Sequence, residues 1–435
     1  MDFLDILTKK RNGIKLTKQE IDFFITGVTN GIIPDYQISA FLMAIYFQSL
    51  DEEEIAHMTL AMANSGEILN LSSIPGFKVD KHSTGGVADT TTLILAPLVA
   101  SVGIPVIKMS GRGLGFSGGT IDKLESIPNF NVEVSQQQAL QWAKQSNIVI
   151  MGQSKNLTPA DRILYALRDV TATVESIPLI ASSIMSKKIA SGADGIVLDV
   201  KCGNGAFMKT LEDAQKLGKC MASMGRHIGK KVTVVISSMS QPLGNYIGNR
   251  LEVIEAIETL KGNIGGDLLA VSLTLGANML LLSGKVSTEQ QGKELLLQNI
   301  QNGKGLEKFK QLLQQQSADT NVIYDYSLLA LSSCKSLLKA NSSGYIYAMD
   351  TDCIGMASQQ TGAGRKQKTD SIDFGAGIIL KKRIGDTVEK GEVLAEVYSS
   401  NEQKCQSAIS LLQNAIHISN IAPSSSPLIL DVISM

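Results

Sequence analysis

The first 65 residues have the pattern of short helices, with hydrophobic positions recurring between polar ones. Residues that fit helix N-caps precede these stretches: Asp2, Thr17 and Asp51. Thr17 and Asp51 are each followed three residues later by a glutamate, which is the spacing of a capping box. Glycines at the expected helix ends fit C-caps: Gly13, Gly31 and Gly66. The N-terminal segment therefore predicts a helical unit.

The pattern changes at residue 77, where short β-rich runs begin to alternate with apolar helices. Strands are predicted over 77–80, 105–109, 148–151 and 195–200, and an apolar helix over 90–102. Short buried strands that alternate with helices are typical of a parallel or mixed sheet with both faces covered. Residues 160–192 return to helical periodicity, and helices dominate again over 249–316.

A chain of 435 residues is too long for one ordinary hydrophobic core. We therefore predict an α/β protein with a discontinuous helical domain (1–68 and 160–192) and a mixed-sheet α/β domain (69–159 and 193–335) across a cleft. A small C-terminal α+β domain is predicted over 336–435. Within it, residues 377–394 form strands joined by tight glycine turns and resemble the sandwich of lipoyl-carrier domains. No lysine lies on an obvious exposed hairpin there, so we predict a structural role.

Charge and composition narrow the class of protein. The net charge of −1, from 40 basic and 41 acidic residues, gives no electrostatic reason to expect a nucleic-acid or membrane partner. No run of eighteen uninterrupted apolar residues occurs, and the N-terminus lacks the apolar core of a signal peptide. Five scattered cysteines and four dispersed histidines favour neither a disulfide framework nor a zinc site. We expect a cytoplasmic protein without an organic cofactor.

Candidate chemistry is concentrated in two glycine-rich segments about thirty residues apart. Residues 108–125 read KMSGRGLGFSGGTIDKLE, and residues 81–89 read KHSTGGVAD. Glycines let backbone N–H groups approach a ligand, while the hydroxyl and basic side chains add donors and positive charge. Such loops suit an oxyanion, above all phosphate. The alternative for either loop alone is a plain turn between packed elements, and neither loop matches a Walker lysine loop or a clean dinucleotide fingerprint.

The residue pattern of these segments resembles that of the pyrimidine-nucleoside phosphorylase and thymidine phosphorylase family. Residues 110–125 meet its signature S-G-R-G-L-x-x-[ST]-G-G-T-x-D-x-L-E. The resemblance continues through LRDVTAT (167–173), SSIMSKK (182–188), DVK (199–201) and GAFM (205–208). It therefore extends over nearly the whole chain.

The resemblance implies a phosphate site on one side of the cleft and a base site on the other. The phosphate residues would be Lys81, His82, Ser83, Thr92, Lys108, Met109, Ser110 and Thr120. Lys81 ends a predicted strand and Thr92 lies in the first turn of the next helix, so both face the crevice where open α/β sheets bind ligands. A cap near Asp89 would begin that helix.

The base site would come from the middle helical segment. The residues implied are Tyr165, Arg168, Ser183 and Lys187, together with His82. Ser183 and Lys187 are four residues apart and so share a helix face. Charge develops on a pyrimidine as its glycosidic bond breaks, and the resemblance implies that His82, Arg168 and Lys187 stabilise it as catalytic residues. The alternative for Lys187 and its neighbour Lys188 is a solvated helix end.

The family also implies a potassium ion, at positions that are here Ala88, Thr90, Leu243, Tyr246 and Glu255. Ala88 departs from the usual glycine, and Tyr246 from a usual small residue. The alternative for Glu255 is an ordinary ion pair on a helix surface. Two further departures, Phe116 for a common histidine and Ser117 for threonine, put the substrate range in doubt.

We therefore expect reversible phosphorolysis of uridine, deoxyuridine and thymidine to free base and pentose 1-phosphate. The segment 240–249 supports the broader pyrimidine branch over the strict thymidine branch. The resemblance further implies a homodimer through the N-terminal helices. The alternatives are a thymidine-specific enzyme, an anthranilate-type phosphoribosyltransferase, which would require an acidic motif for Mg²⁺, and a non-catalytic nucleoside-binding protein.

Overall fold

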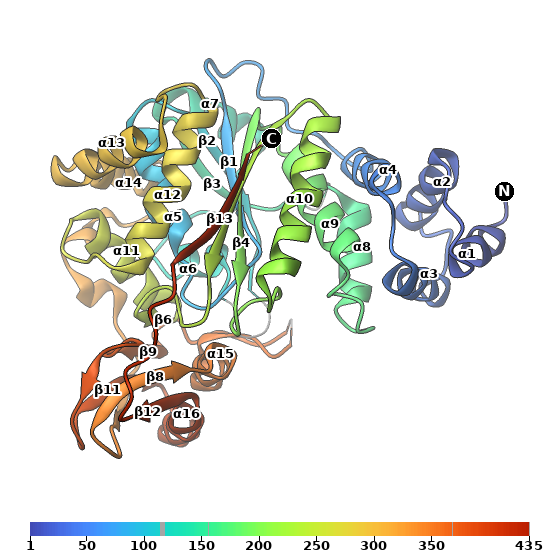
Figure 1. Ribbon diagram of the computed structural model, residues 1–435. Helices are drawn as coiled ribbons and strands as arrows, with labels where there is room; N and C mark the ends of the chain where they lie inside the picture. Colours follow the sequence, from blue (N-terminus) through green and yellow to red (C-terminus); the bar gives the residue numbers. More distant parts are fainter. Residues whose placement is uncertain (114–117, 155, 368, 435) are drawn as a thin grey trace.

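The N-terminal segment forms the predicted helical unit. The computed structural model describes residues 1–113, 118–154, 156–367 and 369–434. Its chain begins with α1 (Phe3–Arg11), α2 (Lys18–Thr29), α3 (Asp35–Gln48) and α4 (Glu52–Ala63), which lie together at one end of the molecule (Figure 1). The rings of Phe3, Phe24 and Phe41 pack against one another in this bundle, with centroids 4.4–5.5 Å apart.

The predicted helix starts are confirmed. The Asp2 side chain accepts a hydrogen bond from the Leu4 N–H, and Thr17 and Asp51 form complete capping boxes with Glu20 and Glu54. Glu54 also pairs with Lys10 at 2.8 Å, and both side chains are 3% exposed. This buried pair joins α1 to α4, so the capping glutamate is also a tertiary contact.

Two of the three predicted glycine caps are confirmed. Gly13 and Gly31 follow α1 and α2 with φ of +74° and +67°. Gly66 is different, because its φ is not among the positive values and α4 ends three residues earlier. A Cβ at Gly66 would lie 2.0 Å from the carbonyl oxygen of Asn156 and 2.5 Å from Cδ of Pro159. Gly66 is therefore required by close backbone approach and not by helix termination.

A parallel sheet forms the centre of the molecule. Strands β1 (Val79–Ser83), β4 (Gly195–Cys202) and β5 (Lys231–Ser238) run parallel in the order β1-β4-β5. Beside β1 lies a second parallel pair, β2 (Val106–Ser110) and β3 (Ile148–Gly152). The predicted strands are confirmed with ends that differ by no more than three residues. The carboxyl ends of β1, β2 and β4 thus open at the same edge.

Helices cover both faces of this sheet (Figure 1). One face packs against helices whose buried residues form a single core: α5 (Thr91–Ser101), α11 (Asn249–Leu260), α12 (Asp267–Leu282), α13 (Glu289–Gln301) and α14 (Lys304–Gln315). The other face shares a core with the N-terminal bundle, α8 (Pro159–Arg168), α9 (Ile177–Ala190) and α10 (Leu211–His227). Shorter helices complete this part: α6 (Thr120–Glu125), α7 (Gln136–Ser146), η1 (Thr320–Ile323) and η2 (Tyr326–Leu329).

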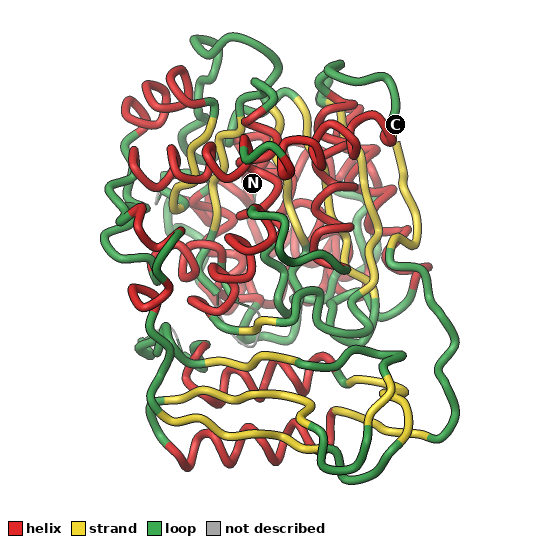
Figure 2. The backbone as a smooth tube through the Cα atoms, turned by 90° about the vertical axis from the view of Figure 1, so that its left-hand side faces the viewer, coloured by secondary structure: helices red, strands yellow, loops and turns green. Residues whose placement is uncertain are grey.

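The C-terminal part forms a separate lobe of strands and helices (Figure 2). Its elements are β7 (Cys334–Lys339), β8 (Gly344–Met349), α15 (Thr351–Ser358), η3 (Gln359–Ala363), β9 (Gly377–Leu380), β10 (Thr387–Val388), β11 (Val393–Ser399), α16 (Glu402–Ala415) and β12 (Ile416–Ser419). They make two sheets, ordered β10-β8-β12 and β6-β9-β11-β7. Strand β6 (Tyr246–Ile247) comes from the α/β region, so the two parts share a sheet.

The last strand does not stay in this lobe. Strand β13 (Ile429–Ser434) pairs antiparallel with β5 of the central sheet, although the sequence analysis assigned all of 336–435 to the C-terminal domain. The return of the chain covers the outer edge of β5, which would otherwise present unpaired backbone groups. None of the helices within the described ranges is both long and apolar enough to cross a membrane.

We expect Gly66→Ala to destabilise the protein, because the new Cβ would meet the backbone of residue 156. Overpacking of this kind typically costs about 1–3 kcal/mol. Gly265→Ala is the matched control, since a Cβ there would meet nothing within 4 Å and its φ is not positive. Thermal unfolding followed by circular dichroism should give a lower midpoint for Gly66→Ala alone. Equal midpoints for the two variants would contradict the close-approach explanation.

Candidate active site

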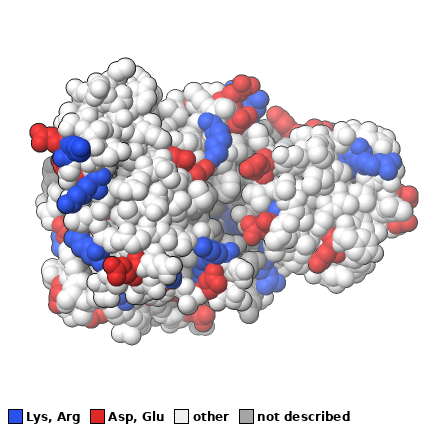
Figure 3. Space-filling view, turned by 90° about the horizontal axis from the view of Figure 1, so that it is seen from below, with Lys and Arg blue, Asp and Glu red and all other residues white. Residues whose placement is uncertain are grey.

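A cavity of about 230 Å³ lies at the carboxyl ends of β1 and β2. Its walls include every residue that the sequence analysis assigned to phosphate: Lys81, His82, Ser83, Thr92, Lys108, Met109, Ser110 and Thr120. The two glycine-rich segments also contribute Gly85, Gly86, Gly111 and Gly118. Segments thirty residues apart in sequence therefore meet at one site, as predicted. From below, the surface is hollowed between the helical bundle and the rest of the molecule (Figure 3).

The parallel sheet explains why these groups converge. Ser83 ends β1 and Ser110 ends β2, while Thr92 and Thr120 lie in the first turns of α5 and α6. Strand ends and the following helix starts meet at one edge in such sheets. Asp89 does not cap α5 as predicted, because the cap position is Thr90. Its carboxylate instead accepts the hydroxyl of Thr91 at 2.6 Å and the Thr91 N–H at 3.3 Å.

The glycine-rich segments contribute two lysines to the cavity, Lys81 and Lys108, and each is held by buried contacts. Lys81 Nζ donates to the Thr91 hydroxyl at 2.6 Å and lies 3.5 Å from Asp199 Oδ2. Lys108 Nζ donates to the Lys81 carbonyl at 2.6 Å and lies 3.6 Å from Asp80 Oδ1. Burial lowers the pKa of Lys108 to about 7, although the charge of Asp80 opposes this shift. Lys108 therefore changes charge near neutral pH.

Asp80 connects the two sides of the cavity. Its carboxylate has no exposed surface and lies between Lys108 and Lys188, with Lys188 Nζ at 2.7 Å. Burial alone would raise the pKa of Asp80, but the charges of Lys108 and Lys188 outweigh it and lower the pKa. Lys188 is 2% exposed, so the alternative of a solvated helix end is wrong for this residue. The ion pair fixes α9 to β1.

His82 stands among positive charges at the cavity wall. Burial lowers the pKa of His82 well below its usual value, and the charges of Lys188, Lys108, Lys187 and Lys81 lower it further. The imidazole is therefore neutral at pH 7. A neutral imidazole still carries one N–H and can donate a single hydrogen bond.

Four of the five residues assigned to the base lie on α8 and α9, and the fifth, His82, lies on β1; His82 and Lys187 line the cavity. Lys187 lines the cavity, donates to the Ser183 hydroxyl at 2.8 Å and pairs with Asp161 at 2.6 Å. The ring of Tyr165 lies 5.7 Å from both Lys187 Nζ and the Arg168 guanidinium carbon. Tyr165, Arg168 and Ser183 thus form a second layer next to Lys187, outside the lining of the 230 Å³ cavity.

Arg168 is tied to the backbone. Its guanidinium donates to the carbonyls of Thr173, Leu179 and Val174 at 3.2, 3.1 and 2.6 Å. Burial lowers the pKa of Arg168 to about 10, so the group remains charged at neutral pH. A guanidinium has five N–H groups, and these contacts use three of them. The three hydrogen bonds hold the turn between α8 and α9, and two N–H groups are not used by these contacts.

The residues assigned to potassium lie together behind the cavity. The Ala88 carbonyl accepts the Gly244 N–H at 3.2 Å, and Leu243 N–H donates to the Val87 carbonyl. Glu255 accepts the N–H groups of Asn245 and Tyr246 at 2.7 and 3.3 Å. Thr90 instead donates to Glu252, one turn before Glu255. Ala88 has a φ of +54°, which explains why a glycine suits this position.

Glu255 is a buried carboxylate and not part of a surface ion pair. It is 1% exposed, and burial raises its pKa to about 7 despite the two backbone hydrogen bonds. The nearby carbonyls of Pro242, Leu243 and Gly244 accept from the Arg383 guanidinium at 2.6, 3.4 and 3.2 Å. Among the described residues, no cluster of His, Cys, Asp and Glu fits a metal ion. Any cation held here would rely on backbone carbonyls and the Glu255 carboxylate.

Several residues of the site were missed by sequence reasoning. They are Asp80, Asp161, Gln153, Leu157, Asp199, Lys201 and Arg383. One signal was present, because Asp199 and Lys201 belong to the DVK motif that carries part of the resemblance. The charged residues Asp80, Asp161 and Arg383 act through partners distant in sequence; Asp80 and Lys188, for example, are 108 positions apart. Phe116 and Ser117 lie outside the described residues.

Comparisons with known proteins agree with this architecture. Family profiles match residues 76–306 ("Glycosyl transferase family, a/b domain"), 4–66 ("Glycosyl transferase family, helical bundle domain") and 345–419 ("Pyrimidine nucleoside phosphorylase C-terminal domain"). A pyrimidine-nucleoside phosphorylase of Staphylococcus haemolyticus is 54% identical over 418 residues, 96% of each chain. One of Geobacillus stearothermophilus is 52% identical over 434 residues, 100% of each chain.

The fold also has a relative among solved structures. The crystal structure of anthranilate phosphoribosyltransferase from Thermus thermophilus aligns with a TM-score of 0.61 and 18% identity. The alignment covers 73% of this chain and 100% of that one. At this identity the likeness shows a shared fold alone.

The pKa of Lys108, about 7, predicts that anion binding weakens as pH rises. Lys108 is charged below this value and neutral above it, whereas the lowered pKa of His82 places its titration below that of Lys108. Sulfate keeps its charge at these pH values and is a suitable probe. We expect its affinity, measured by calorimetry, to fall about tenfold between about pH 6 and about pH 8.5, equivalent to about 1.4 kcal/mol.

Lys108→Gln is the control for this titration. The variant should bind sulfate weakly at both pH values, because it carries no charge at this position at either pH. If the variant retained the same pH dependence as the unaltered protein, another group would be responsible and the assignment to Lys108 would be wrong.

Proposed function

The chain belongs to the pyrimidine-nucleoside phosphorylase family of pentosyltransferases, and we propose that it catalyses reversible phosphorolysis of uridine, deoxyuridine and thymidine. The products are the free pyrimidine base and ribose or deoxyribose 1-phosphate. One observation carries the proposal: the anion-binding residues of both glycine-rich segments and Lys187 of the base side line the same cavity. Nucleophile and leaving group can therefore be held together.

Phosphate is the nucleophile in this proposal. Lys81 and Lys108 supply charge, and the hydroxyls of Ser83, Ser110 and Thr120 supply neutral donors. Such a site orients the anion before it attacks C1′ of the pentose, which removes much of the entropic barrier. The phosphate oxygen forms a bond to C1′ as the bond from C1′ to the base nitrogen breaks, and the electron pair of that bond moves onto the base.

The departing base needs stabilisation of its negative charge, and the base side of the cavity is positive. Lys187 is a quarter exposed and lies at the wall, so it can reach the pyrimidine oxygens. Neutral His82 can donate its N–H, and Arg168 retains two N–H groups beyond those given to backbone carbonyls. Donors fixed before the reaction stabilise the transition state more than the ground state.

We base the proposed substrate range on the segment 240–249, because it resembles the branch of the family that accepts both uridine and thymidine. Its loop is held by Arg383, which also pairs with Asp267 at 2.7 Å. A thymidine-specific enzyme is the alternative outcome, in which uridine is not turned over.

A homodimer through the N-terminal helices is also part of the proposal. An apolar groove lies between α1 and α3, and Leu4 and Phe47 on its rim are 55% and 75% exposed. A second copy of this chain, packed on the groove, would bury these side chains.

A potassium ion near Glu255 is the remaining component. In the described part of the chain the buried Glu255 carboxylate forms no salt bridge, and burial raises its pKa although the charge of Arg383 opposes this shift. Carboxylate and carbonyl oxygens suit a hard cation. Held there with Ala88, Thr90, Leu243 and Tyr246, the ion would join the loop before α5 to the loop before α11.

Base release with and without phosphate tests the activity. We expect uracil to be released from uridine only when phosphate is present, in equal amount with ribose 1-phosphate. The reason is that the cavity offers an anion site, while the lowered pKa of the partly buried His82 makes its imidazole a weak base for activating water. Equal rates in phosphate-free buffer would identify a hydrolase. No release under either condition would favour a phosphoribosyltransferase or a non-catalytic binding protein.

Potassium should raise the thermal midpoint relative to tetramethylammonium at equal ionic strength, because a ligand that binds only the folded state stabilises it. Glu255→Gln should abolish this difference, since the amide cannot compensate the charge of the ion. Glu294→Gln, a change at an exposed position of α13, is the control and should keep the full effect. The cation proposal fails if Glu255→Gln responds to potassium as the unaltered protein does.

A further inference from the structure

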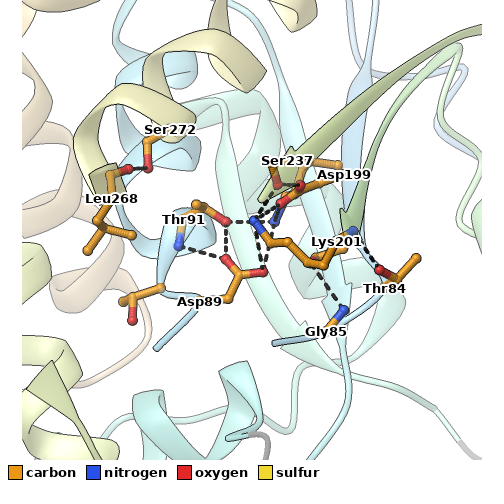
Figure 4. Close-up of polar contacts among 12 residues, drawn as sticks. Thr84, Gly85, Asp89, Thr91, Asp199, Lys201, Ser237, Leu268 and Ser272 are labelled. Atoms are coloured by element: carbon orange, nitrogen blue, oxygen red, sulfur yellow. Dashed lines mark hydrogen bonds and ion pairs between the residues drawn. The ribbon is translucent and has the colours of Figure 1, made fainter. Parts of the chain in front are cut away.

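Beneath the cavity, four charged side chains form a cluster: Lys81, Asp89, Asp199 and Lys201. Figure 4 shows Asp89, Asp199 and Lys201 converging from the loop before α5 and from β4. Lys201 Nζ lies 2.8 Å from Asp199 Oδ2 and 3.9 Å from Asp89 Oδ2. Lys81 Nζ lies 3.5 and 3.9 Å from the same two oxygens. The two lysines therefore share the two carboxylates.

Lys201 has no access to the cavity. Its side chain is 0% exposed, and it is absent from the lining, whereas Lys81 and Asp89 both line the wall. Ser237 completes the pairing, because its hydroxyl accepts from Lys201 at 3.0 Å and donates to Asp199 at 2.7 Å. A lysine buried this completely is costly unless it compensates another charge. The charges to be compensated are those of Asp199 and Asp89.

The strand fixes this arrangement. Asp199 and Lys201 are two residues apart on β4, so their side chains share one face of the sheet. The backbone holds the cavity loop to the same strand, because Lys201 N–H donates to the Thr84 hydroxyl at 2.9 Å and Thr84 N–H donates to the Asp199 carbonyl at 3.0 Å. The distance between the cluster and the loop is thus set by β4.

The charge balance of the cluster depends on Lys201. With it, two positive and two negative groups sum to zero. Without it, two carboxylates would face Lys81 alone, and the cluster at this part of the wall would carry a net negative charge. Lys81 would then be drawn toward Asp199 and Asp89, and an entering anion would meet repulsion.

We propose that Lys201 is a positioning residue for phosphate: by neutralising Asp199 and Asp89, it leaves Lys81 available to bind the anion. This inference rests on the proposed phosphorolysis, because it concerns the phosphate side of the same site. Lys201 contacts neither substrate in this arrangement. Its effect is carried by the two carboxylates and reaches the anion through Lys81.

Lys201→Met tests the proposal through steady-state kinetics with uridine and phosphate. The KM for phosphate should rise at least tenfold, while the KM for uridine should change by less than about threefold. Sulfate affinity by calorimetry should fall in parallel and does not depend on turnover. A variant that folds and keeps both the phosphate KM and the sulfate affinity of the unaltered protein would overturn the inference.

Two further variants separate charge balance from a general loss of structure. Asp199→Asn/Lys201→Met removes one charge of each sign and should return the phosphate KM to within about threefold of the unaltered value. Asp199→Asn alone removes a negative charge beside Lys81 and should raise the phosphate KM less than Lys201→Met does, because an entering anion meets one carboxylate fewer. These two variants also carry the test if Lys201→Met does not fold.

A rise of the phosphate KM in Asp199→Asn or in the double variant, equal to that in Lys201→Met, would assign the cluster a purely structural role. Absence of phosphorolysis in the unaltered protein would instead refute the proposed function. In that case sulfate binding by the same variants still tests the charge balance.

Discussion

The cavity depends on the burial of charged side chains at the carboxyl ends of three parallel strands. A buried charge is tolerated only when it is paired and hydrogen-bonded. Here Asp80 lies between Lys108 and Lys188, and Asp199 lies between Lys81 and Lys201. The two carboxylates therefore compensate lysines that line the cavity: Lys108 and Lys188 for Asp80, and Lys81 for Asp199. An entering anion meets lysine side chains that are already fixed in place, so binding costs little side-chain conformational entropy.

The same pairs join the phosphate side to the base side. Lys187 reaches the cavity from α9, and the next residue, Lys188, anchors that helix to β1 through Asp80. The position of a base held by α9 is thereby tied to the strand that carries Lys81 and His82. In the proposed reaction, this connection holds the base and the phosphate at a fixed distance from each other, on either side of the C1′ atom at which the bond is exchanged.

Much of the architecture could be predicted because it depends on local patterns. Short stretches of sequence determine the capping boxes at Thr17 and Asp51 and the buried strands. The phosphate residues could be grouped because strand ends in a parallel sheet converge. Partners distant in sequence could not be predicted: Asp80 with Lys188, the backbone carbonyls that hold Arg168, and β13 against β5. Gly66 was wrongly predicted as a helix C-cap, because its close approach to residue 156 is a tertiary contact that the neighbouring sequence does not indicate.

A crystal structure of the protein grown with phosphate tests the central claim most directly, because the claim is that both glycine-rich segments bind one anion. We predict one phosphate in the 230 Å³ cavity, within hydrogen-bond distance of Lys81, Lys108 and Ser110. A cavity without the anion at saturating phosphate, or an anion bound by only one of the two segments, would contradict the account.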